Sequence, residues 1–126
     1  MQQFNGYVQV DTFHVNGRLT LGENIADYGG ILTGYDALQR ALVRDGRPKL
    51  IDGYTPEQRF VLGYAQSWRS QTRDAALRTR VTVDPHAPEP WRVNGPLSDS
   101  PAFAKAFGCK PGDPMVRSPE VVPQIW

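Results

Sequence analysis

A long apolar stripe of helical period dominates the first third of the chain. Between residues 25 and 42, apolar side chains recur at steps of three and four: Ile25, Tyr28, Ile31, Leu32, Tyr35, Leu38, Ala41 and Leu42. This spacing is typical of an amphipathic helix with one buried face. Thr20 and Glu23 have the spacing of a capping box, and Gly46 ends the pattern. The sequence therefore predicts one helix from about residue 20 to residue 45.

Three glycines, Gly29, Gly30 and Gly34, lie inside this predicted helix. Each glycine weakens a helix by about 1 kcal/mol relative to alanine. Their presence predicts that another element packs closely against the helix there, or that the helix bends.

A second helix is predicted to begin at Thr55-Pro56-Glu57-Gln58, which combines a capping box with proline at the first helical position. Its expected buried stripe consists of Phe60, Val61, Tyr64, Ala65, Trp68 and Leu77. A short third helix is predicted from Ala102 to Phe107, with Gly108 as its stop. The fold class predicted from these helices is mainly α, in one domain that spans residues 1–126.

The remaining segments lack a clear period. Residues 1–19 are interpreted as extended or irregular, with some strand character at residues 7–10. Residues 81–97 contain four prolines and are interpreted as an ordered loop with short extended pieces. The tail from residue 109 is interpreted as irregular, and its apolar end, Ile125-Trp126, is expected to dock on another surface.

The composition excludes several classes of function. The net charge is +1 and no run of basic residues occurs, which argues against binding of nucleic acid. No stretch is long and apolar enough for a transmembrane helix. A single cysteine, Cys109, excludes an internal disulfide and a thiolate metal cluster. The two histidines, His14 and His86, lie too far apart to form an H-E-x-x-H pair.

Two acids stand one turn apart at the start of the first predicted helix. Glu23 and Asp27 are at positions i and i+4 and therefore share one face. Acids are also favoured in a first helical turn by the helix dipole, so simple capping is the favoured explanation from residue types alone.

A single histidine and an arginine mark the proline-rich segment 81–97. From residue types alone, His86 is more often a solvated loop histidine than a functional one. Arg92 would by the same reasoning pair with a nearby acid such as Glu89.

The string Gly22-Glu23-Asn24-Ile25-Ala26-Asp27-Tyr28-Gly29-Gly30 resembles the G-E-N-I-A-D-x-G-G signature of the neprilysin and endothelin-converting enzyme family. The resemblance implies that Glu23 is the third zinc ligand. It also implies that Asp27 accepts a hydrogen bond from a zinc-bound histidine on another helix, as outer carboxylates commonly do. One departure is Tyr28, where many members have asparagine.

A second string resembles the family's D-x-H-x-P motif with the following R-x-x-G, here Asp84-Pro85-His86-Ala87-Pro88 and Arg92 to Gly95. The resemblance implies that His86 stabilises the oxyanion formed during peptide hydrolysis, with Asp84 orienting it. Arg92 would hold a substrate carbonyl on the primed side.

Ala65-Gln66-Ser67-Trp68 resembles the family segment that lines the first primed-side pocket. The resemblance implies that Trp68 and Ser67 bind substrate, although a plain core role for Trp68 fits the residues equally well.

The C-terminal part continues the resemblance from Pro96 to Cys109, with Asp99 in place of the usual asparagine. Pro123 stands where animal members have a cysteine, which suits a bacterial-type member. We therefore expect the complete protein to be periplasmic, secreted or anchored to a membrane and facing outward.

The resemblance as a whole implies a zinc-dependent metalloendopeptidase, of which this chain is the C-terminal helical part of a thermolysin-like (zincin) catalytic domain. Residues 1–126 lack H-E-x-x-H, so we expect the chain alone to be inactive, to bind little zinc and to self-associate. Expected partners are peptide substrates and the rest of the peptidase chain. One alternative is a truncated, non-catalytic helical module that binds peptides or a partner; another is a zinc site shared between chains of an oligomer.

Overall fold

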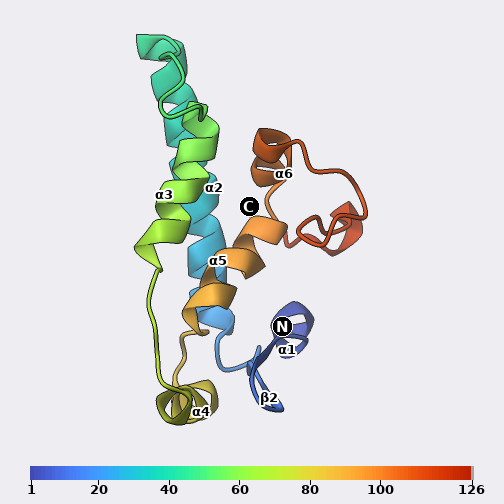
Figure 1. Cartoon of the computed structure of the whole chain (residues 1–126). Coiled ribbons are helices and arrows are strands. Elements are labelled where there is room, and N and C mark those ends of the chain that lie inside the picture. The colour runs from blue at the N-terminus through green and yellow to red at the C-terminus, as the bar shows by residue number, and fades with distance from the viewer. Residues whose placement is uncertain (126) are drawn as a thin grey trace.

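Two antiparallel helices, α2 (Leu21–Asp45) and α3 (Pro56–Ser67), form a hairpin against which α5 and α6 pack (Figure 1). The computed structural model describes residues 1–125, so Trp126 and its expected docking lie outside the described residues. The other helices are α1 (Gln2–Asn5), α4 (Asp74–Val83), α5 (Glu89–Ser98), α6 (Pro101–Phe107) and the short 3-10 helix η1 (Pro119–Val121). Strands β1 (Val8–Val10) and β2 (Phe13–His14) pair in an antiparallel ribbon. The mainly helical fold class is confirmed.

Helix α2 begins where it was predicted, but not through the predicted capping box. The hydroxyl of Thr20 donates to the carbonyl oxygen of Asn16 at 3.0 Å and accepts from the amide of Asn24 at 2.9 Å. No hydrogen bond caps the helix through the Thr20 side chain. The capping role expected for Glu23 is therefore wrong, and its carboxylate is available for other contacts.

The glycines of α2 do not interrupt the helix, which runs without a break through all three. A side chain at Gly34 would stand 3.2 Å from the ring of Phe60 on α3, so close packing explains this glycine. At Gly30 a side chain would meet nothing within 4 Å. Of these two glycines, only Gly34 marks a close approach of α2 and α3.

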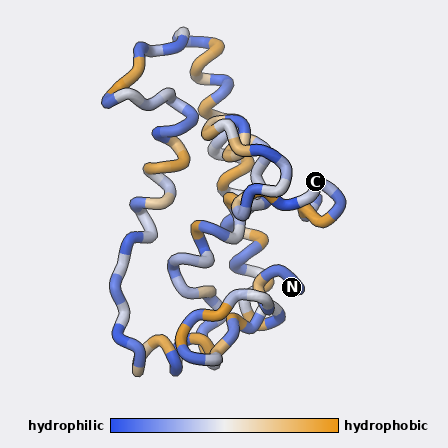
Figure 2. Tube along the Cα trace, turned by 45° about the vertical axis from the view of Figure 1, so that its right-hand side comes forward, coloured by the Kyte–Doolittle hydropathy of each residue, from blue (hydrophilic) through white to orange (hydrophobic). Residues whose placement is uncertain are grey.

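Helix α3 begins with the predicted capping box. The N–H of Gln58 donates to the hydroxyl of Thr55 at 3.2 Å, and the N–H of Thr55 donates to the Gln58 side chain at 3.0 Å. The helix ends at Ser67, so Leu77 belongs to α4 and its inclusion in the α3 stripe is wrong. Figure 2 shows hydrophobic and hydrophilic stretches alternating along the long helices, as amphipathic helices require.

The interpretation of residues 81–97 as a loop is wrong, because most of the segment is helical. Pro88 is the N-cap of α5 and Pro90 lies in its first turn, where a missing N–H costs no hydrogen bond. Pro96 lies inside α5 and cannot donate to the carbonyl oxygen of Arg92, four residues earlier. The hydroxyl of Tyr64 on α3 donates to that oxygen instead, at 2.8 Å. A tertiary contact thus replaces the helical hydrogen bond.

Helix α5 lies between two apolar clusters. The first contains Phe4, Val15 and Ala87, with Tyr7 stacked on Trp91 of α5 at 4.1 Å between ring centroids. The second contains Ile31, Val61 and Leu97, with partly buried side chains from α3, α5 and α6 around them. Packing on both sides fixes the position of α5 against α2.

A partly buried ion pair joins the tail to the helices. Arg117 donates to the carboxylate of Asp99 at 2.7 Å, and the hydroxyl of Tyr28 donates to the Asp99 carbonyl oxygen at 3.1 Å.

Among the described residues, no helix is long and apolar enough to cross a membrane.

Candidate functional site

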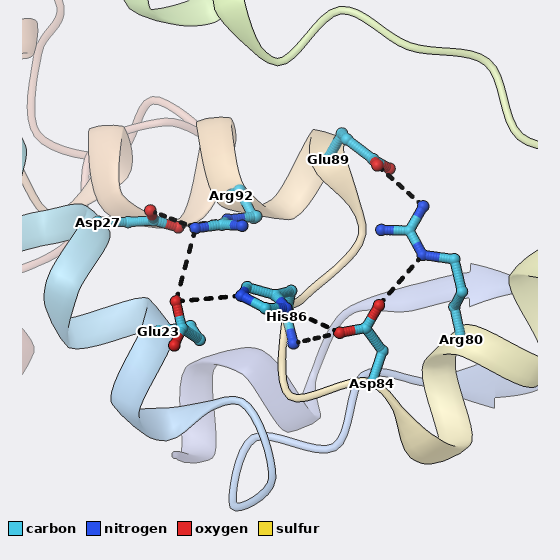
Figure 3. A network of polar contacts seen from close by, with 7 residues as sticks. All are labelled: Glu23, Asp27, Arg80, Asp84, His86, Glu89 and Arg92. Carbon is cyan, nitrogen blue, oxygen red and sulfur yellow. Dashed lines mark hydrogen bonds and ion pairs between the residues drawn. The ribbon is translucent and has the colours of Figure 1, made fainter.

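Four of the predicted site residues meet where the N-terminal turns of α2 face α5 and the segment that precedes it (Figure 3). Glu23 and Asp27 project from α2, His86 lies between α4 and α5, and Arg92 projects from α5. A carboxylate oxygen of Glu23 stands 3.3 Å from Nε2 of His86 and 3.9 Å from Nη2 of Arg92. The side chains of Glu23 and His86 are 41% and 42% exposed, so both remain accessible to solvent.

Asp27 and Arg92 form a bidentate ion pair in the deeper part of the site. Nε and Nη2 of Arg92 each donate to one oxygen of Asp27 at 2.8 Å, and the two side chains are only 13% and 8% exposed. The guanidinium carbon of Arg92 also lies 3.9 Å from the ring centroid of Trp68, a cation–π contact. Residue types alone suggested that Arg92 pairs with Glu89. In the structure its partner is Asp27 instead.

The hydroxyl that supports Arg92 from α3 remains protonated over the usual pH range. Burial of Tyr64, helped by the negative charge of Asp27, raises the pKa of its phenol to about 12. The hydroxyl therefore stays a donor to the Arg92 carbonyl oxygen.

Asp84 holds His86 in place through one carboxylate oxygen. Both the backbone N–H and the ring Nδ1 of His86 lie 2.9 Å from Oδ1 of Asp84. The backbone N–H of His86 is the main cause that lowers the pKa of Asp84, and the His86 ring and Arg80 add to it. His86 thus lies between two carboxylates, with Asp84 at Nδ1 and Glu23 at Nε2.

Arg80 extends this network, and sequence reasoning did not identify it. Nε of Arg80 lies 3.4 Å from Asp84 and Nη1 lies 2.8 Å from Glu89, the first residue of α5. The spacing of Arg80 and Asp84, i and i+4, was the signal in the sequence, but the interpretation of residues 81–97 as a loop obscured it.

The two predicted substrate-binding residues at the end of α3 differ in their placement. Trp68 reaches the site through its contact with Arg92, and its indole Nε1 is buried without a hydrogen-bond partner. Ser67 is exposed, and its hydroxyl donates to the carbonyl oxygen of Tyr64 at 2.7 Å. The structure therefore brings Trp68 into the constellation and turns the Ser67 hydroxyl back onto its own helix.

The side chains that could serve as ligands determine which metal this chain could hold. Within residues 1–125, no three His, Cys, Asp or Glu side chains converge as a metal site. Glu23 offers an exposed carboxylate, a known type of zinc ligand, but a catalytic zinc site needs three protein ligands. The residues fit a zinc site to which this chain gives one ligand, and they do not fit a site built from this chain alone.

Comparison with known proteins points to one family of peptidases. The sequence matches Peptidase family M13 over residues 1–122. It is 40% identical to endothelin-converting enzyme 1 of Mus musculus, over 100% of this chain and 16% of that protein. It is 39% identical to neprilysin-2 of Caenorhabditis elegans, over 99% of this chain and 17% of that protein.

A solved structure supports the same relationship at the level of the fold. The zinc metalloprotease Zmp1 of Mycobacterium tuberculosis superposes with a TM-score of 0.93 at 37% identity, over 99% of this chain and 20% of that one. The helical arrangement and the sequence together define a part of a metallopeptidase fold. The chain belongs to peptidase family M13. It spans about a sixth of the length of the curated relatives it matches.

Proposed function

We propose that this chain is the C-terminal part of the catalytic domain of a zinc-dependent metalloendopeptidase, and that Glu23 is its third zinc ligand. The observation that carries the proposal is the placement of the Glu23 carboxylate. It takes no part in capping, is 41% exposed, and lies 3.3 Å from His86 and 3.9 Å from Arg92. Membership of family M13 supports peptide-bond hydrolysis as the reaction.

Zinc would polarise the scissile carbonyl and make water a stronger nucleophile at neutral pH. Asp27 would support one of the other zinc ligands from outside. Each Asp27 oxygen accepts one bond from Arg92, and a carboxylate has about four acceptor sites. Capacity therefore remains for the ring N–H of a histidine from another part of the protein.

His86 and Arg92 would act on the substrate. His86 would donate from Nε2, which lies 3.3 Å from the Glu23 carboxylate, while Asp84 holds the ring at Nδ1. Such a donor would stabilise negative charge on the oxygen of the scissile carbonyl. Arg92 bonds Asp27 through Nε and Nη2, which leaves Nη1 to donate to a peptide carbonyl of the substrate. Trp68 would line the same side of the site.

The test is Glu23→Gln in the complete protein, with zinc content and turnover of a peptide substrate as readouts. Loss of an outer partner of a metal ligand costs 10- to 100-fold in affinity or activity, and loss of a ligand should cost more than about 100-fold. Glu120→Gln, an exposed acid on η1, is the matched control and should change neither readout. Unchanged zinc content and turnover in Glu23→Gln would refute the ligand assignment. An unaltered protein that neither binds zinc nor cleaves peptides would instead favour the non-catalytic binding module.

A further inference from the structure

The segment that carries His86 is tied at both ends to one side chain. It runs from Asp84, the C-cap of α4, to Pro88, the N-cap of α5. Arg80 contacts Asp84, the first residue of the segment, at 3.4 Å. It also contacts Glu89, the residue directly after the segment, at 2.8 Å. All three side chains are partly buried, so the contacts are screened less than those of fully exposed ion pairs.

The two oxygens of Asp84 divide their contacts between His86 and Arg80. Oδ1 accepts from the backbone N–H of His86 and faces its ring Nδ1, each at 2.9 Å. Oδ2 is left for Arg80. Rotation of the carboxylate away from the His86 ring would therefore break the contact with Arg80 as well.

We propose that Arg80 is a positioning residue, which holds His86 at the site by fixing Asp84 and joining the end of α4 to the start of α5. The proposal rests on the proposed role of His86 as oxyanion donor. A guanidinium suits this task because its planar fork presents several donors at fixed angles and can reach two acids at once. Arg80 itself touches neither substrate nor metal in this arrangement.

The first test is the kinetics of Arg80→Met in the complete enzyme. A displaced oxyanion donor should lower kcat with little change in KM, because the lost contact is made only in the transition state. We expect a loss of roughly 10-fold, a part of the 10²- to 10³-fold that removal of a whole donor costs. Arg78→Met is the matched control on the same helix, since Arg78 pairs with the exposed Asp11 at 2.8 Å and with no other acid among residues 1–125. Its kcat should stay at the level of the unaltered enzyme.

A conservative variant separates positioning from simple charge. In Arg80→Lys a single ammonium can hold one acid but lacks the fork for both, so turnover should recover only in part. Complete recovery would overturn the two-ended role of the guanidinium.

Hydrogen exchange gives a readout that does not depend on activity. Between residues 85 and 90, Pro85, Pro88 and Pro90 have no N–H, so exchange reports mainly on His86 and its two remaining neighbours. In the metal-free complete enzyme, Arg80→Met should speed exchange in this segment because the Asp84 contact to the His86 N–H loosens. Arg78→Met should leave the rate unchanged.

A double-variant cycle with His86→Ala distinguishes the two proposals. If Arg80 acts through His86, Arg80→Met should cause no further loss of kcat once His86 is alanine. An equal loss in both backgrounds, or unaltered exchange in Arg80→Met, would overturn the positioning role. An unchanged kcat in His86→Ala alone would instead refute the oxyanion role on which the inference rests.

Discussion

The ion pair between Asp27 and Arg92 should be the strongest single polar contact in the site. Both side chains are nearly buried, at 8% and 13% exposure, and two bonds of 2.8 Å join them. Removing one partner of a buried pair costs about 3–5 kcal/mol, because the other charge is left unpaired. Asp27→Asn should fall below that range, at about 2–3 kcal/mol, since Asn keeps an acceptor and Trp68 still faces the guanidinium. Arg92→Met should cost about 3–4 kcal/mol, because it leaves the Asp27 charge without its partner.

The assay is a double-mutant cycle on the 126-residue chain, with unfolding in urea followed by circular dichroism. The double variant loses both charges together, so its cost should fall short of the sum by about 2 kcal/mol. The urea m-values of the unaltered chain and the three variants must be equal for their free energies of unfolding to be compared. The exposed pair of Asp36 and Arg40 on α2, 2.7 Å apart, is the control and should couple by less than about 0.5 kcal/mol. A coupling that small between Asp27 and Arg92 would refute the reasoning.

Two further predictions concern stability. Thr55→Ala should cost about 1 kcal/mol, because the N–H of Gln58 loses its capping acceptor; an unfolding midpoint equal to that of the unaltered chain would contradict this. The pKa of Asp84 is lower in the folded chain than its ordinary value of 3.8. The stability that its ionised carboxylate contributes is therefore complete above pH 3.8 and is lost as the pH falls through the lowered pKa of the folded chain. The difference in unfolding free energy between the unaltered chain and Asp84→Asn should therefore shrink below pH 3.8, and a constant difference would show that the ionised carboxylate is not its source.

Local signals were sufficient wherever the chemistry of a helix end is contained in a few neighbouring residues. The capping box at Thr55 and the stop at Gly108, which adopts a left-handed conformation with φ of 67°, formed as predicted. At Thr20 the same kind of signal failed. There the hydroxyl bonds Asn16 and Asn24, and Glu23 is turned to His86 instead. The side chains of a capping motif can bond to residues outside the motif, and the spacing of the motif alone does not reveal this.

The helical state of residues 89–98 could not be predicted from local propensity. Pro96 removes an internal hydrogen bond, and the compensating donor, Tyr64, lies on another helix. The same error hid the network around Arg80, because an i, i+4 contact has meaning only once a helix is assigned. The sequence string identified Glu23 and His86 as candidates, but only the packing of α5 on α2 brings them within 3.3 Å.

The Tyr64 hydroxyl also bears on the order in which the chain folds. A segment of ten residues is too short to be a stable helix alone, and Pro96 weakens α5 further. Its Arg92 carbonyl oxygen gains this partner only when α3 lies against α5. The helix that carries Arg92 to Asp27 should therefore become stable only together with α3, so that the site depends on a helix that contributes no acid to it. A chain in which α3 and α5 have not packed together would lack the placement of Arg92 against Asp27.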